Sequence, residues 1–414
     1  MRGAARAEWA NSWHLVLLTI VGLTCAPTVL PPYTLGIFVA PLSGAFGWSR
    51  GAIQTAIMFS TGLGVVGGPL AGWLVQRFGP RRAIMSGLLG MTVGLVLCAN
   101  IDGHIWQLYF AYGLMAVAGA GAAGVSWSYL ISKRFAASRG LALGLALSGT
   151  GLCAVLMPRI TAASIDRWDW RGAYLALAAI VFLIVLPLCV LILPRGAGND
   201  QLPSARPVSP PTGLTLPQAV RDFRFWIIGA SSAGIYLAIG GIIPNLVPVM
   251  TDRGLATAQA VSIMSVFGLS VVAGRIVIGA LIDHFWAPAV GAAVLLPAAI
   301  ACYLLTTNAS VVGYAICAAF IGAATGMELD MLGFLIARYF GLREFARIYG
   351  RIFMFVAGAA GTAPAAYGFL YDATNNYWWP LIMSAILLCA SASGLLTLGR
   401  YPRPESGVSR HAED

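Results

Sequence analysis

Charged side chains are rare in the apolar stretches of this chain, and three of them could bind an anion or carry a proton. Arg275, Glu328 and Asp330 all lie inside long apolar runs. Charged groups are costly at membrane depth, and they often mark binding sites, ion pairs or proton relays. An arginine stays charged and offers a planar fork for two carboxylate oxygens, whereas a buried carboxyl group can take up and release a proton. The three residues therefore predict an anion site beside a proton-carrying group.

The spacing of these residues predicts that two of them meet. Arg275 lies eight residues before Asp283, and Asp330 lies eight residues before Arg338. At about 1.5 Å per residue, both lie about 12 Å from the ends of their helices. Glu328 is about 200° from Asp330 around a helix, so the two acids cannot share one face. One acid is expected to pair with Arg275. Asp330 matches it in depth and is the first choice as proton carrier, with Glu328 as the second. A static ion pair that only stabilises the protein is the alternative.

Few other side chains could share this chemistry. Tyr33, Tyr129, Tyr236 and Asn245 are predicted to bind the substrate, with Ser126 as a further polar residue of the path. Such residues are also common where helices pack in membranes. The four histidines lie near span ends or in tails, and the only lysine lies in a loop. The sequence contains no metal-ligand spacing, nucleophile elbow or phosphate loop. It therefore predicts no metal, no cofactor and no enzymatic activity.

The composition indicates which elements must position these residues. Of the 414 residues, 59% are hydrophobic and only 10% are charged, whereas soluble chains have roughly 25% charged residues. About 20 apolar residues cross a bilayer as a helix, and barrel strands would be shorter and alternate in polarity. The sequence predicts an all-α membrane protein with twelve transmembrane helices at 13–40, 51–77, 82–99, 105–132, 140–166, 171–194, 225–250, 257–284, 287–307, 310–338, 345–370 and 375–399.

The basic residues predict the orientation. If the spans alternate, 18 of the 25 Lys and Arg residues fall on one side of the membrane and four on the other. Basic residues are enriched on the cytoplasmic side, so both termini are expected in the cytoplasm and the protein in the cell inner membrane. The net charge of +10 thus reflects topology, and no nucleic-acid partner is expected.

The chain divides into two halves. Residues 1–194 and 225–399 each contain six predicted spans, residues 195–224 form a Pro-rich linker, and residues 400–414 form a tail. A local pattern recurs about half the chain length apart. Its first copy contains Gly72, Gln76, Arg77, Gly79 and Arg81, and its second contains Gly279 and Asp283. Two six-helix bundles related by a pseudo-two-fold axis are expected, with the substrate path between them.

The first copy resembles the loop motif G-x-x-x-D-R-x-G-x-R of the major facilitator superfamily. In that family the glycine permits close helix packing, and the charges latch the cytoplasmic side. Gln76 stands where the aspartate is usual, and Asp283 keeps the acid in the second copy. The resemblance implies a gating motif at these positions.

A narrower resemblance covers nearly the whole chain. It is carried by the segments that begin at Tyr33 (YTLGIFVAPL), Phe46 (FGWSR), Arg139 (RGLALG), Asp169 (DWR), Pro248 (PVMTDRG) and Arg338 (RYFG). These segments are similar to bacterial members of the monocarboxylate transporter family and its oxalate–formate exchanger relatives. The resemblance implies small organic acids as substrates.

The resemblance also bears on the site residues. It places Arg275 near the family's anion-binding arginine. Tyr33 stands where animal members have a first-span lysine, and the exchanger's eleventh-span lysine is missing near Val356. A single deep arginine suits a monoanion better than a dianion such as oxalate.

These observations predict a monomeric secondary active transporter that moves a small organic acid with a proton across the lipid bilayer by alternating access. An organic anion exchanger or an efflux permease of the same fold is the alternative. A drug/proton antiporter would carry an arginine in the fourth span, where Tyr112 to Gly124 have none. A non-transporting sensor would need a signalling domain, for which the short tails leave little room.

Overall fold

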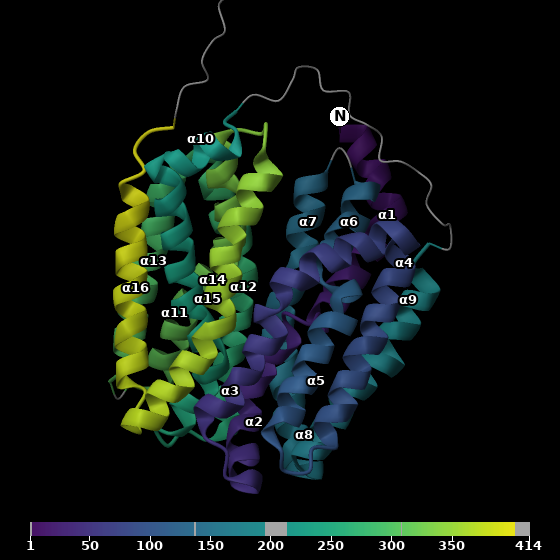
Figure 1. Cartoon of the computed structure of the whole chain (residues 1–414), viewed down its shortest axis with the longest axis vertical. Helices are drawn as coiled ribbons and strands as arrows, with labels where there is room; N and C mark the ends of the chain where they lie inside the picture. Colours follow the sequence, from purple (N-terminus) through teal and green to yellow (C-terminus); the bar gives the residue numbers. More distant parts are fainter. Residues whose placement is uncertain (1, 136–137, 195–212, 308, 402–414) are drawn as a thin grey trace, which may run out of the picture.

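The computed structural model describes residues 2–135, 138–194, 213–307 and 309–401. Each element named in these ranges is a helix (Figure 1). The first half contains α1 (Arg2–Thr24), α2 (Leu30–Phe46), α3 (Arg50–Ile57), η1 (Met58–Gly62), α4 (Gly64–Ala99), α5 (Ile105–Ala118), η2 (Ala120–Ala122), α6 (Gly124–Arg134), α7 (Arg139–Leu147), α8 (Gly149–Ala179), η3 (Ile180–Val185) and α9 (Leu186–Ile192). The second half contains α10 (Leu216–Arg221), α11 (Phe223–Thr251), α12 (Thr257–His284), α13 (Ala287–Leu304), α14 (Val311–Phe340), α15 (Phe345–Thr374) and α16 (Trp378–Leu396).

These helices give twelve membrane crossings in two bundles of six, as predicted. Among the described residues, eight helical stretches are long and apolar enough to cross a membrane. Two of them, Arg50–Ala99 and Arg139–Ile192, each contain a sharp bend, at Gly79 (φ 82°) and at Asp169 (φ 62°), and so cross twice. The pairs α1 with α2 and α5 with α6 supply the other two crossings. The protein is a multi-pass membrane protein.

The first bundle is built from interrupted helices. The crossing predicted over 13–40 is present but is not one continuous helix, because α1 ends at Thr24 and α2 begins only at Leu30. Pro27 cannot continue a helix, and a proline disfavours helical backbone at the residue before it. The π-helical turn η1 interrupts the second crossing, and Ser148 separates α7 from α8 in the fifth.

The second bundle differs in this respect. Helices α11, α12, α14 and α15 are continuous over 28 to 30 residues. Helices α12 and α14 contain no proline, so their backbone groups are satisfied within each helix.

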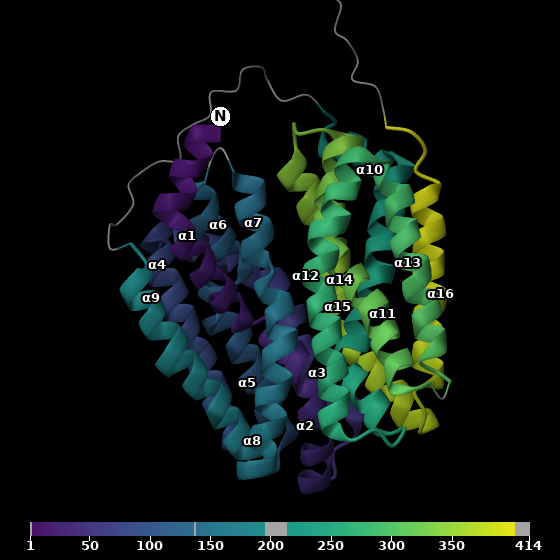
Figure 2. The ribbon, with the colours of Figure 1, turned by 180° about the vertical axis from the view of Figure 1, so that it is seen from behind.

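The two bundles touch backbone to backbone at glycines. A Cβ atom at Gly36 would lie 1.8 Å from the carbonyl oxygen of Pro244, and one at Gly361 would lie 2.6 Å from Cα of Gly62. A Cβ atom at Gly368 would lie 2.5 Å from Cα of Gly51. In Figure 2, α2 and α3 of the first bundle lie against the second at the end of the molecule opposite α10 and the N-terminus. The bundles are therefore closely packed at that end.

Most of the predicted linker and tail lies outside the described residues, at 195–212 and 402–414. The described end of the linker is docked onto the second bundle. The backbone N–H of Leu214 donates to the Phe340 carbonyl at 2.8 Å, and that of Leu216 donates to the Glu344 carboxylate at 2.8 Å. The second hydrogen bond lowers the pKa of Glu344, because it stabilises the charged carboxylate.

Candidate substrate site between the bundles

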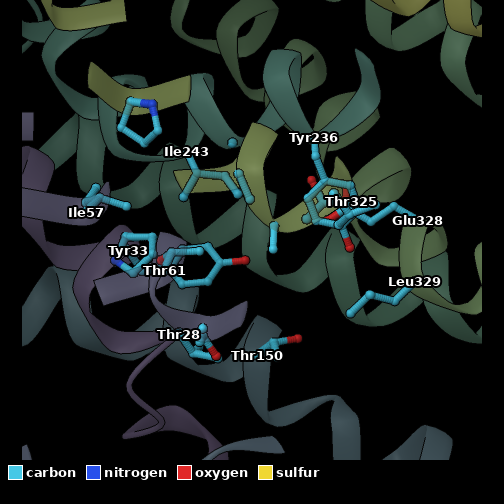
Figure 3. A pocket seen from close by; sticks show the side chains of 18 of the residues that line it. Thr28, Tyr33, Ile57, Thr61, Thr150, Tyr236, Ile243, Thr325, Glu328 and Leu329 are labelled. Carbon is cyan, nitrogen blue, oxygen red and sulfur yellow. The ribbon is translucent and has the colours of Figure 1, made fainter. Parts of the chain in front are cut away.

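A cavity of about 250 Å³ lies between the bundles and is lined by both (Figure 3). Its polar lining comprises Thr28, Tyr33, Thr61 and Thr150 from the first bundle, and Tyr236, Arg275, Thr325 and Glu328 from the second. Apolar side chains, including Ile57, Ile243, Val271, Leu329, Phe353 and Val356, form most of the remaining wall. A mostly apolar pocket with a few polar groups is typical of sites for small molecules.

Interrupted helices supply much of the first bundle's share of this wall. Thr28 lies between α1 and α2, Thr61 lies in η1, and Thr150 lies in the first turn of α8. Irregular backbone is tolerated at membrane depth where it lines a cavity. The helix breaks thus coincide with the place where the bundles face a shared space.

Arg275 is only 8% exposed and reaches across the boundary between the bundles. Its Nε lies 3.3 Å from Oδ2 of Asp330, so the contact predicted from equal depth is present. Its Nη1 donates to the carbonyl of Leu147 in the first bundle at 2.8 Å. That carbonyl ends α7, where the helix breaks at Ser148, and it also accepts the Thr150 hydroxyl at 3.0 Å. The Asp330 side chain is 39% exposed and does not line the cavity.

Glu328, unlike Asp330, faces the cavity. It lines the cavity, and its Oε2 atom is buried without a hydrogen-bond partner among the described residues. The hydroxyl of Tyr236 is also buried and lies next to the Glu328 carboxyl group, and Figure 3 shows the two side chains on one side of the cavity. The two acids of α14 thus differ, since Asp330 compensates the arginine and Glu328 faces the cavity.

Tyr33 lines the cavity from the first bundle. It lies in the first turn of α2, directly after Pro31 and Pro32, whose fixed φ suits a helix start. Its ring packs against Phe267 of the second bundle, with centroids 6.3 Å apart. Figure 3 shows its hydroxyl pointing into the cavity toward Tyr236.

Two of the predicted substrate-binding residues do not line the cavity. Asn245 is fully buried and forms a reciprocal amide pair with Gln54 of the first bundle, at 2.7 and 2.8 Å. Tyr129 is half-buried on α6, away from the lining residues. Ser126 is also absent from the lining, although its hydroxyl is buried without a partner in the described part of the chain.

Arg50 closes the face opposite the termini. Its guanidinium binds both oxygens of Asp252, at 2.8 and 3.1 Å, and donates to the Tyr377 hydroxyl at 3.0 Å. It also lies 4.0 Å from the centre of the Tyr371 ring. Asp372 accepts the backbone N–H groups of Arg50 and Gly51 at 3.0 and 2.8 Å. Because Arg50 belongs to the first bundle and its partners to the second, this cluster holds the bundles together.

The predicted gating motif is not packed against the other bundle in this conformation. A Cβ atom at Gly72 or Gly279 would meet nothing within 4 Å, so the close packing expected there is not observed. The side chains of Gln76 and Arg77 are exposed.

The other motif residues have local roles. Gly79 makes the left-handed bend between two crossings. Arg81 donates to the carbonyls of Val190 and Leu193 and so caps the end of α9. Asp283 lines a pocket on the face that carries the termini, together with Arg338 and Arg400.

Sequence reasoning missed Thr61, Gln54 and the partners of Arg50. Thr61 and Gln54 are uncharged and lie in apolar surroundings, where nothing in their local sequence separates them from packing residues. The proline cluster at 27–32 was the one available signal for a break in the first crossing.

Comparisons with known proteins agree with this architecture. The sequence model described as Major Facilitator Superfamily matches residues 15–332. The chain is 27% identical over 388 residues to Monocarboxylate transporter 11 of Homo sapiens, covering 87% of this chain and 77% of that protein. It is 26% identical to Monocarboxylate transporter 13 of Bos taurus, covering 89% and 85%.

Solved structures share the fold. A bacterial homologue of the human lysosomal transporter Spinster, in an inward-facing and unoccupied conformation, superimposes with a TM-score of 0.62 at 18% identity, covering 94% of this chain and 92% of that one. Two bundles of six spans, a shared cavity between them and a match over most of the length lead to one conclusion: the chain belongs to the major facilitator superfamily and is a transporter, not an enzyme.

Proposed function

We propose that this transporter moves a small monocarboxylate together with a proton. Arg275 binds the carboxylate, Glu328 carries the proton, and Tyr33 and Tyr236 line the path on either side. The observation that carries the proposal is the presence of one arginine and one cavity-lining carboxyl group, Glu328, in a single cavity between the bundles. The relatives named monocarboxylate transporters support the same substrate class.

The charges of the site support a coupling between binding of the substrate anion and protonation of Glu328. Arg275 is compensated by Asp330 when the site is empty. A substrate anion adds one negative charge to a region of low dielectric, where an unpaired charge is costly. A proton on Glu328 removes one negative charge at the same time. The loaded site then has the arginine, one ionised aspartate and one anion, so its net charge of −1 is the same as that of the empty site with Glu328 ionised.

Uptake into proteoliposomes tests the proposal. We expect butanoate uptake driven by an inward pH gradient to fall to background in Arg275→Gln and to stay very low in Arg275→Lys, because an ammonium lacks the bidentate fork. Arg159→Gln is the matched control, since Arg159 is an exposed arginine of α8 that does not line the cavity. Normal uptake by Arg275→Gln would exclude the anion site.

The same assay addresses the alternative of an exchanger or efflux permease. An exchanger would take up butanoate only when the vesicles are preloaded with an organic acid. A symporter would concentrate it in empty vesicles in response to the pH gradient.

The membrane orientation belongs to the same proposal. We propose a monomer in the cell inner membrane with both termini in the cytoplasm, because most basic residues flank the crossings on the side of the termini. Reporter fusions after residue 200 and at the C-terminus should both give a cytoplasmic signal. A periplasmic signal from either fusion would contradict this orientation.

A further inference from the structure

The hydroxyl of the half-buried Thr61 differs from the hydroxyls of the fully buried threonines in the described part of the chain. In a helix, threonine can satisfy its hydroxyl on the carbonyl four residues earlier. Thr19, Thr34, Thr161 and Thr325 all do so, at 2.7 to 2.9 Å. The Thr61 hydroxyl is buried and has no hydrogen-bond partner in the described structure.

The π-helical turn explains this exception. Thr61 lies in η1, and a π-helical turn displaces the preceding carbonyls from the positions that they have in an α-helix. The carbonyl that Thr61 would use, that of Ile57, accepts the hydroxyl of Ser60 instead, at 3.2 Å. A buried unsatisfied polar group costs free energy, so a partner from outside the protein would stabilise this arrangement.

The position of Thr61 indicates what that partner is. Thr61 lines the cavity from the first bundle, and in Figure 3 it lies on the opposite side from Tyr236 and Glu328. The turn that carries it is pressed against the second bundle, since a Cβ at Gly361 would lie 2.6 Å from Cα of Gly62. The second π-helical turn, η3, contributes no residue to this cavity, so the π geometry alone does not make a site.

We infer that Thr61 is a specificity-determining residue that hydrogen-bonds a polar substituent of the substrate remote from its carboxylate. This inference rests on the proposed function, because it assumes that Arg275 holds the carboxylate. A small acid with a hydroxyl group then bridges the bundles, with Arg275 at one end and Thr61 at the other. A plain aliphatic acid leaves the Thr61 hydroxyl unpaired and binds less well.

The test compares butanoate with 2-, 3- and 4-hydroxybutanoate in proteoliposomes, with each rate expressed relative to butanoate. We expect the parent protein to prefer at least one hydroxylated acid. That preference should fall about 3- to 10-fold in Thr61→Val, which has the same shape without the hydroxyl, and persist in Thr61→Ser. Thr161→Val is the control, because the hydroxyl of Thr161 is also inside the protein but is satisfied by its own helix, and Thr161 does not line the cavity.

The outcomes separate the two proposals. If butanoate is transported in an Arg275-dependent way but the parent treats all four acids alike, or Thr61→Val keeps the preference, the role of Thr61 is excluded and the proposed function stands. If none of the four acids is transported, the proposed function is wrong, and this inference, which rests on it, is wrong as well. Should Thr61→Val lose its fold, the Thr61→Ser variant and ligand-induced shifts in the melting temperature of the parent still measure the preference.

Discussion

The two bundles share one architecture but divide the chemistry and the flexibility between them. The second bundle provides Arg275, Asp330 and Glu328 from continuous helices. The first bundle contributes no charged side chain to the cavity, and its wall comes largely from interrupted helices. A continuous helix fixes the position of a charged group against its partner, whereas a broken helix exposes hydroxyl and carbonyl groups that adapt to a ligand. This difference indicates that the second bundle positions the charged groups of the site and that the first bundle discriminates between solutes of different shape.

The largest effect should come from removing the unpaired acid of the second bundle. We expect Glu328→Gln to lose accumulation driven by a pH gradient, by at least about tenfold, while it retains exchange between preloaded vesicles and medium. Exchange returns the loaded carrier without net movement of protons, so a fixed neutral side chain does not block it. The measurement is the accumulation ratio and the exchange rate of labelled butanoate in the same preparation.

If Glu328→Gln still concentrates butanoate in response to the pH gradient, Glu328 does not carry the coupled proton. Asp330→Asn would then be the next variant to measure, since Asp330 is the other acid of α14 and contacts Arg275.

The next effect concerns the packing of the bundles. Gly36→Ala places a Cβ where the Pro244 carbonyl oxygen lies 1.8 Å away. Overpacking costs typically 1–3 kcal/mol, so we expect closure of this face to be disfavoured and uptake to fall about tenfold. Gly44→Ala on the same helix is the control, since a Cβ there meets nothing within 4 Å. Equal uptake rates in the two variants would indicate that α2 shifts to accommodate the methyl group.

A smaller effect is expected at the buried amide pair. Gln54→Leu removes the donor to Asn245 Oδ1 and leaves that oxygen unsatisfied, at a cost of about 1–3 kcal/mol, while Asn245 Nδ2 still donates to the Gly241 carbonyl. The double variant Gln54→Leu/Asn245→Leu should recover part of this loss, because no amide then remains to be satisfied. The melting temperatures of the purified proteins measure both changes. An additive loss in the double variant would contradict this account of the pair.

The smallest effect lies at the docked end of the linker. The pKa of Glu344 is lowered because its carboxylate accepts the Leu216 N–H group. This contact therefore stabilises the fold above the unfolded pKa of a glutamate, about 4.3, and is lost as the pH falls through the lower folded value. We expect Glu344→Gln to lower the melting temperature slightly at pH 7, and the difference from the parent to shrink as the pH falls below the unfolded value. A constant difference between the two proteins across this range would argue against the linkage.

Much of the architecture could be predicted from sequence, because every crossing must be an apolar helix long enough to span the lipid bilayer. Twelve apolar runs, the division into halves and the contact between Arg275 and Asp330 follow from length, charge and depth. The helix breaks could not be placed, because several of them involve glycine, alanine and serine rather than proline.

The site was predictable only in part, for a different physical reason. Helix rotation decides whether Glu328 or Asp330 faces the cavity, and apolar surroundings on all sides leave no periodic signal from which to read that rotation. Asn245 resembled a path residue for the same reason, although its amide is satisfied within the interface by Gln54.

The contact of Asp372 with the start of α3 has a kinetic consequence. The carboxylate satisfies two first-turn N–H groups of a helix that belongs to the other bundle. When this face opens, the two N–H groups at the start of α3 lose the Asp372 carboxylate and form hydrogen bonds with water instead. Losing a helix cap costs typically about 0.5–2 kcal/mol, which lengthens the average lifetime of the closed state roughly 2- to 30-fold if the transition state has already lost the contact. The turnover rate would then depend on the lifetime of the closed state at this face, independently of the affinity for the substrate.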